Sequence, residues 1–182
     1  MPLGNRVKSD ALSTVYTDQV YALGTTYVQL ADEVDEGISG VNTAVTSTLL
    51  QGERTWIFVK ANAAIAAGDL CKRNAITTPY VAAKDDGNET DAIKLVGVAD
   101  HAIDAGKYGW IIARGMCVVQ TKGGVSASAL LASDGNTVAG EVDTWTAGAG
   151  LSRKIIGIAN EAEGGGAEYG AGFVVATIDL LI

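Results

Sequence analysis

From Arg54 onward, short apolar runs alternate with turn residues, and this alternation constrains the fold more than any other feature of the sequence. Turn signals such as Gly68-Asp69 and Asp86-Gly87 recur at intervals of roughly 8 to 15 residues, and the runs between them are rich in β-branched residues. No segment repeats its apolar residues at helical spacing over a useful length. The pattern therefore predicts an all-β sandwich or barrel, with less than about one-sixth of the residues in helices.

The composition limits the kinds of site that such a fold can carry. Of the 182 residues, 28 are alanine and 23 are glycine, whereas only 11 are aromatic. Small side chains favour closely approaching backbones over large aromatic pockets. The net charge is −8, the pI is near 4.5, and no basic stretch is visible. We therefore expect no nucleic-acid partner.

The N-terminal stretch MPLGNRVKSDALS lacks the apolar core of a signal peptide. No segment approaches the roughly 18 apolar residues of a membrane span. We therefore expect synthesis in a cytoplasm and no membrane partner. Cys71 and Cys117 lie in apolar runs without CxxC spacing. They are expected to be buried free thiols, with a disulfide or a reactive role as the alternative.

Residues 1–50 differ from the remainder because they are rich in Thr, Ser and Val and have weak periodicity. We interpret them as an extended N-terminal arm with short strands, preceding a β domain over residues 51–182. The alternative is that they form a loosely packed start of the same domain. Arg6 and Lys8 are the only basic residues of this region, and they precede the acidic run at 32–36.

Two pairs of segments resemble each other. WIFVKA at residues 56–61 matches WIIARG at 110–115, and VGVAD at 96–100 matches IGIAN at 156–160. The first pair has the shorter offset, so an internal two-fold duplication would need an insertion between the matching parts. Strands within one sandwich also resemble one another, and that alternative stays open.

The sequence contains few residues in patterns typical of reactive chemistry. His101 is the single histidine, so it cannot build a histidine-rich metal site, and no nucleophile signature accompanies it. We expect a surface or structurally hydrogen-bonded histidine. Asp85, Asp86, Glu89 and Asp91 lack the register of a calcium loop and predict a solvated turn. The glycine-rich stretches precede no helix, so they are not phosphate loops. We expect no enzymatic activity, no cofactor and no metal.

Trp145 lies in the polar, glycine-flanked stretch EVDTWTAGAG, whereas Trp56 and Trp110 begin predicted strands. A tryptophan in a loop can anchor a protein interface. The alternative is that Trp145 folds back as a lid on the protein's own core.

The segments WIFVKANAAIAAGDLCKR, VGVADHAIDAGKYGWIIARGMCVV, IIGIANEAE and GFVVATIDL occur in this order. As a set they resemble the capsid decoration, or cement, proteins of tailed bacteriophages, over roughly residues 52 to 182. No single motif is specific, and the first 50 residues depart from the family's pattern. The matching positions are Phe58–Lys60, Ala64–Asp69, Val96–Ala99, Tyr108–Gly115 and Phe173–Leu180.

The resemblance implies a compact β-sandwich or barrel-like (β-tulip-like) domain that binds the major capsid protein on the outer face of the phage head, without catalysis. It also implies self-association, with a trimer favoured and a dimer as the alternative. Under this interpretation the arm supplies capsid contacts, with strand addition as one form. The alternative is that residues 11–30 add an edge strand to the protein's own sandwich. The candidate contacts are Arg6, Val7, Lys8, Leu12, Val15 and Tyr16.

Two other functions remain open from the sequence. The AAIAAGDLC segment also resembles the turn of β-clip accessory domains of enzymes, which would make this chain a lid or substrate-binding element. A carbohydrate-binding β-sandwich would use exposed aromatic residues such as Trp145 and Tyr169 as its platform.

Overall fold

The computed structural model describes residues 12–30, 52–75, 77–87, 95–133, 138–146, 155–163 and 172–180. These ranges contain ten β-strands and no helix, so the all-β prediction is confirmed. Within them, accordingly, no helix has the length and apolarity needed to cross a membrane. The strands are β1 (Thr26–Gln29), β2 (Arg54–Ala61), β3 (Leu70–Ala75), β4 (Thr78–Lys84), β5 (Leu95–Val98), β6 (Tyr108–Gln120), β7 (Leu130–Ser133), β8 (Val142–Thr144), β9 (Ile155–Ala159) and β10 (Phe173–Asp179).

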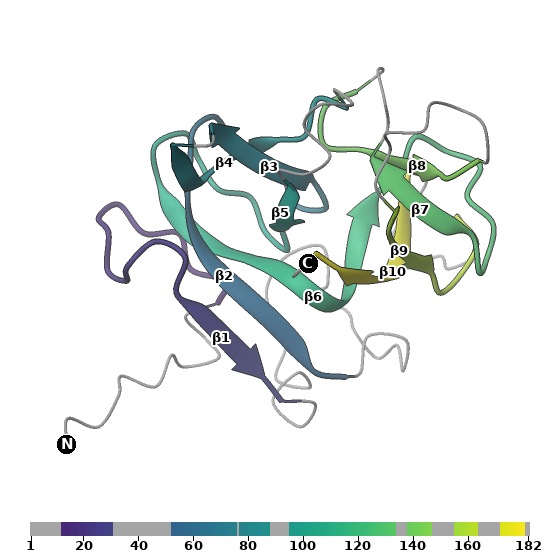
Figure 1. Cartoon of the computed structure of the whole chain (residues 1–182), viewed down its shortest axis with the longest axis horizontal. Coiled ribbons are helices and arrows are strands. Elements are labelled where there is room, and N and C mark those ends of the chain that lie inside the picture. The colour runs from purple at the N-terminus through teal and green to yellow at the C-terminus, as the bar shows by residue number, and fades with distance from the viewer. Residues whose placement is uncertain are drawn as a thin grey trace.

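The strands form one hydrogen-bonded sheet in the order β1-β2-β4-β3-β5-β6-β10-β9-β7-β8, and β2 also pairs with β6. β6 is 13 residues long, and because of this length its start pairs with β2 while its end pairs with β10. In Figure 1, β1 to β5 gather on one side of the molecule and β7 to β10 on the other, with β6 crossing between them. We call residues 54–113 the first half and residues 114–180 the second half.

Hydrogen-bonded pairs of the first half recur in the second half at a constant offset. We call a residue of the first half and a residue of the second half equivalent when their sequence numbers differ by the same amount as those of Val96 and Ile156. In the turn before β3, the amide of Gly68 donates to the carbonyl of Ala99 at 2.7 Å. In the turn before β7, the equivalent amide of Ser128 donates to the carbonyl of Ala159 at 2.8 Å. Further equivalent pairs are Ala61↔Ala82 and Thr121↔Val142, Leu70↔Val98 and Leu130↔Ile158, Cys71↔Gly97 and Leu131↔Gly157, and Lys72↔Leu95 and Ala132↔Ile155.

The match between WIFVKA and WIIARG does not follow the offset of these equivalent pairs. These segments form β2 and the start of β6, which are antiparallel neighbours with Phe58 opposite Trp110 and Trp56 opposite Ile112. By the offset of the hydrogen-bonded pairs, β2 is equivalent to the end of β6 and not to its start. The similarity of the two segments therefore reflects the core they share, since both contribute large buried side chains to it.

Each half has an apolar interior, and the two interiors use equivalent positions. One cluster of buried side chains in the first half includes Ile57, Val59, Ile65, Cys71, Ala82, Val96 and Ala99. The equivalent residues are buried together in a second cluster, namely Cys117, Val119, Val125, Leu131, Val142, Ile156 and Ala159.

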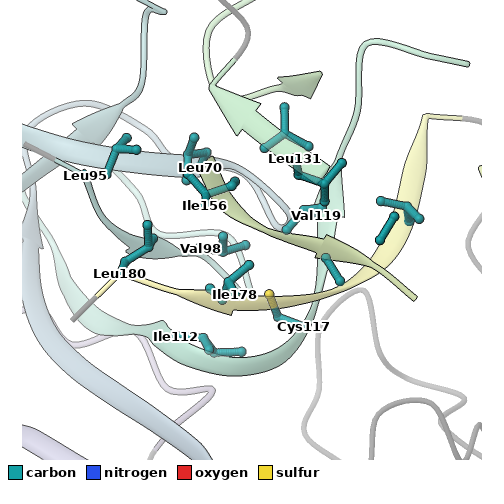
Figure 2. Packing of buried hydrophobic residues seen from close by; sticks show 14 of the residues in the cluster. Leu70, Leu95, Val98, Ile112, Cys117, Val119, Leu131, Ile156, Ile178 and Leu180 are labelled. Carbon is teal, nitrogen blue, oxygen red and sulfur yellow. The ribbon is translucent and has the colours of Figure 1, made fainter. Parts of the chain in front are cut away.

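The second cluster also contains the outer face of the first half. Leu70, Leu95 and Val98 point away from the first interior and are buried in the second cluster with Ile178 and Leu180 of the second half (Figure 2). The backbone amide of Leu180 donates to the carbonyl of Ala113 at 2.9 Å, beside the Val98–Ile112 pairing. The second half is therefore packed directly on the outer face of the first.

Residues 12–30 pack on the first half. Leu12 is fully buried, and Tyr16 exchanges backbone hydrogen bonds with Tyr108 at 2.8 and 3.0 Å. The ring of Tyr21 lies 5.2 Å from that of Phe58, and β1 pairs with β2. Leu12 and Tyr16 thus contribute to this protein's own core, and their contact with a capsid partner stays a prediction.

Among the other expected contacts, Val15 is 38% exposed. Arg6, Val7 and Lys8 lie outside the described residues. The part of the arm that the structure describes therefore supplies a strand to the sheet, and the role of the preceding residues stays a prediction.

Candidate docking surface

A groove of about 550 Å³ lies on the outer face of the second half, where β6, β9 and β10 meet the start of β2. Ile155 and Ile158 of β9 form its apolar part, and their side chains are 41% and 46% exposed. The remaining lining combines polar or charged residues with glycine and isoleucine. It comprises Glu53, Thr55, Arg114, Gly115, Thr177 and Asp179, together with Ile156, Gly157 and Ile178.

The charged part of the groove follows from strand register. Arg114 of β6 lies opposite Thr55 of β2 and opposite Asp179 of β10. Directly opposed residues of antiparallel strands share a face, so these three side chains form a row. The Arg114 Nε atom is 3.5 Å from the Asp179 Oδ2 atom, and both side chains are more than half exposed. Such a pair adds little stability but places two opposite charges at the rim.

Two glycines allow the backbones around the groove to approach closely. Gly115 has a φ of +108°, and a Cβ atom there would collide with the carbonyl oxygen of Glu53. A Cβ atom on Gly157 would collide with the carbonyl oxygen of Thr177. Both positions therefore require glycine, the first also for its backbone conformation.

An irregularity in β9 places the two isoleucines on the same face of the strand. The pairing of β9 with β7 shifts register between Leu131 and Ala132, so the strict alternation of faces is broken. Ile155 and Ile158 face outward, while Ile156 is 1% exposed and packs in the second cluster. The sequence does not indicate this groove, because IIGIA has the composition of a fully buried strand. The match with VGVAD was the one available signal of these positions.

His101 does not lie at the surface, where the sequence led us to expect it. Its side chain is buried, and among the described residues neither ring nitrogen has a hydrogen-bond partner. Burial lowers the pKa of its imidazole to about 4, so the ring is neutral at physiological pH. The expectation of a surface or hydrogen-bonded histidine was wrong. The reason is that the fold buries this side chain, which its local sequence does not indicate.

The two cysteines are buried free thiols, as predicted. Burial raises the pKa of the Cys117 thiol to about 12, and burial with the nearby Asp69 carboxylate raises the pKa of Cys71 further. A thiol with a raised pKa is a poor nucleophile because little thiolate is present. Within the described ranges, no group of three or more His, Cys, Asp or Glu side chains is placed to hold a metal ion.

The predicted solvated turn after β4 also requires correction. Asp85 is 2% exposed and accepts a hydrogen bond from the hydroxyl of Ser133 in β7. Burial raises the pKa of Asp85. Asp86 is exposed and lies 2.6 Å from the Lys72 Nζ atom, whereas Glu89 and Asp91 lie outside the described residues. The segment therefore joins the two halves of the molecule.

Trp145 follows β8 directly and is half-buried. Its backbone amide donates to the carbonyl of Leu130 at 2.7 Å. The backbone of Trp145 is thus fixed to β7, and its role as an interface anchor stays a prediction. Tyr169, the other residue of the proposed glycan platform, lies outside the described residues.

Comparison with solved structures finds a structural likeness. No protein-family model matches the chain, and no curated protein matches it. Among solved structures, the chain is similar to the head fiber gp8.5 N base in bacteriophage phi29, with 12% sequence identity and a TM-score of 0.44. The alignment covers 68% of this chain and 92% of the other.

Proposed function

We propose that this protein is a structural component of a tailed-phage head, which binds the outer surface of the capsid and stabilises it by bridging subunits of the major capsid protein. The observation that carries the proposal is the ordered set of motifs, which resembles the pattern of capsid decoration proteins. Those motifs coincide with β2, the turn before β3, β5, β6 and β10. They are therefore the strands that form the core of an all-β body, and not isolated stretches of similar letters.

The mechanism would be thermodynamic linkage. A protein that binds the assembled, expanded shell more tightly than free subunits stabilises that shell by mass action. Many copies on one particle add their contributions, so each contact can be weak. Such a role needs exposed binding surface and no reactive site. The exposed apolar residues and the neutral, buried His101 fit that requirement.

The test uses expanded heads that lack the protein. Purified protein should co-sediment with these heads at a reproducible number of copies per particle, and it should raise the temperature at which they release DNA or disassemble. Unexpanded precursor shells serve as the control and should bind less. Absence of co-sedimentation, or binding without any gain in head stability, would contradict the proposal.

The residues ahead of Leu12 are the proposed capsid contact, since Arg6 and Lys8 bring positive charge to an acidic chain. Deleting residues 1–11 removes Arg6, Val7 and Lys8 but keeps Leu12 and Tyr16, which belong to the core. This variant should fold and bind heads more weakly. Deleting residues 1–16 also removes core residues, so its stability should fall. Full occupancy of heads by the shorter deletion would assign the capsid contact to the β body.

A further inference from the structure

Positions that are buried in the first half of the molecule are open in the second. Leu95 and Val98 of β5 are 5% and 0% exposed, whereas the equivalent Ile155 and Ile158, which occupy the same hydrogen-bonded positions, are 41% and 46% exposed. The two pairs have the same aliphatic character. The second half therefore presents to solvent a face that the first half covers.

The first half shows what kind of group covers this face. Leu95 and Val98 are buried with Ile178 and Leu180, two aliphatic residues at alternate positions of an extended segment (Figure 2). Residues with this spacing project to one side of a strand. A matching occupant of the groove is thus an extended segment that carries two exposed aliphatic side chains at positions i and i+2.

The described part of the chain contains such a pair in and just after β1. Val28 and Leu30 are 45% and 51% exposed, and they lie on the same side of an extended segment. By contrast, Ile178 and Leu180 are 1% and 5% exposed, so a second copy cannot offer them without unfolding. We propose that the groove binds a second copy of this chain, with Val28 and Leu30 of one copy packed on Ile155 and Ile158 of the other.

The placement of the two surfaces suits association between identical copies. Val28 lies opposite Thr55, and Thr55 lines the groove, so the aliphatic pair and the groove share one face of the sheet. A two-fold arrangement makes each contact twice in a dimer, and a cyclic arrangement closes a trimer. The inference does not depend on attachment to a phage head, because the purified chain alone tests it.

The effect of salt on binding distinguishes a second copy of this chain from a basic partner protein. Each copy carries a net charge of −8, so two copies repel one another at low salt, and added salt should strengthen their association. A basic segment attracted to Glu53 and Asp179 at the rim would instead bind more weakly as salt is added.

The experiment measures self-association of the full chain by sedimentation equilibrium at several salt concentrations. Ile158→Asp places a charge in the groove and should weaken association at least about tenfold, which corresponds to about 1.4 kcal/mol. Val138→Asp is the matched control, because Val138 is a similarly exposed aliphatic residue outside the groove lining. This control should associate as the unmodified chain does. Circular dichroism verifies that both variants are folded.

A charge pair tests the contact directly. Val28→Lys should also weaken association, whereas a mixture of Val28→Lys and Ile158→Asp should form mixed assemblies, since the new lysine of one copy meets the new aspartate of the other. A chain that stays monomeric at all concentrations would overturn the proposal. So would equal association of the Ile158→Asp and Val138→Asp variants. A third result would also overturn the proposal. If the unmodified chain is monomeric and Ile158→Asp abolishes its binding to heads, the groove binds the capsid and not a second copy.

Discussion

Ser128 has a φ of +65° at the position equivalent to Gly68, which has a φ of +85°. Each of the two residues donates its amide hydrogen to the carbonyl of an equivalent alanine, Ala159 for Ser128 and Ala99 for Gly68. A left-handed conformation suits glycine and strains serine by about 1 kcal/mol or more. The same turn is thus built twice, once with the residue it favours and once with a residue it tolerates.

The two turns should respond to substitution in opposite directions. Ser128→Gly relieves the backbone strain but increases the freedom of the unfolded chain, for a net gain of about 0.5 kcal/mol in unfolding free energy. Gly68→Ala should cost about 2 to 3 kcal/mol, because its Cβ atom would also lie 2.8 Å from the Phe173 ring. Gly106→Ala separates these two effects, since Gly106 has a φ of +77° with no atom near its Cβ position. Urea unfolding measures all three, and equal losses at Gly68 and Gly106 would contradict the argument.

Stability should fall as the pH is lowered from about 6.5 to about 4. The unfolded chain binds a proton at His101 with a pKa near 6.5, whereas the buried imidazole does so only near 4. The unfolded state therefore gains protons first, and acidification favours it by up to about 3 kcal/mol. Asp85, whose pKa is raised by burial, changes stability in the opposite direction. Unfolding of the His101→Leu variant across this pH range isolates the histidine, and an unchanged pH slope would contradict the assignment.

Both thiols should be protected in the native protein. Their raised pKa values and complete burial leave little accessible thiolate at Cys71 and Cys117. A thiol reagent at mild alkaline pH should therefore modify them orders of magnitude more slowly than in denaturant, at a rate that tracks chain opening. Single serine variants assign each reaction. Rapid stoichiometric labelling of the folded protein would disprove this.

Glu163 should stabilise the second half through its carboxylate. Its Oε1 atom accepts the Gly172 amide at 3.0 Å, and its Oε2 atom accepts the Val125 amide at 3.3 Å. Glu163→Gln leaves one acceptor and should cost about 1 kcal/mol, and Glu163→Ala removes both acceptors and should cost about 2 kcal/mol. Asp104→Asn, at an exposed position, is the control. Denaturant melts that place all three variants within error of the unmodified protein would refute the role.

The all-β class was predictable from the sequence because turn residues and β-branched runs act locally. Contacts between residues that lie far apart in the sequence could not be predicted in this way. Asp85 has the sequence surroundings of a solvated turn, yet its partner Ser133 lies far along the chain, in β7. Leu12 has no local pattern that distinguishes a core residue from an exposed one, and only its packing beside β2 and β6 decides this. Ile158 is the opposite case, because the segment around it has the composition of a core strand while its side chain is exposed.

The length of β6 has a consequence for how the molecule comes apart. Residues up to Arg114 complete the ladder with β2, and residues from Arg114 complete the ladder with β10. Any cut of the chain between the halves therefore leaves each fragment with an unfinished sheet. Repeat arrays in which each unit keeps its own strands can lose stability one unit at a time. Here both halves depend on β6, so we expect them to melt in one cooperative transition. We also expect separate fragments to be inactive in head binding.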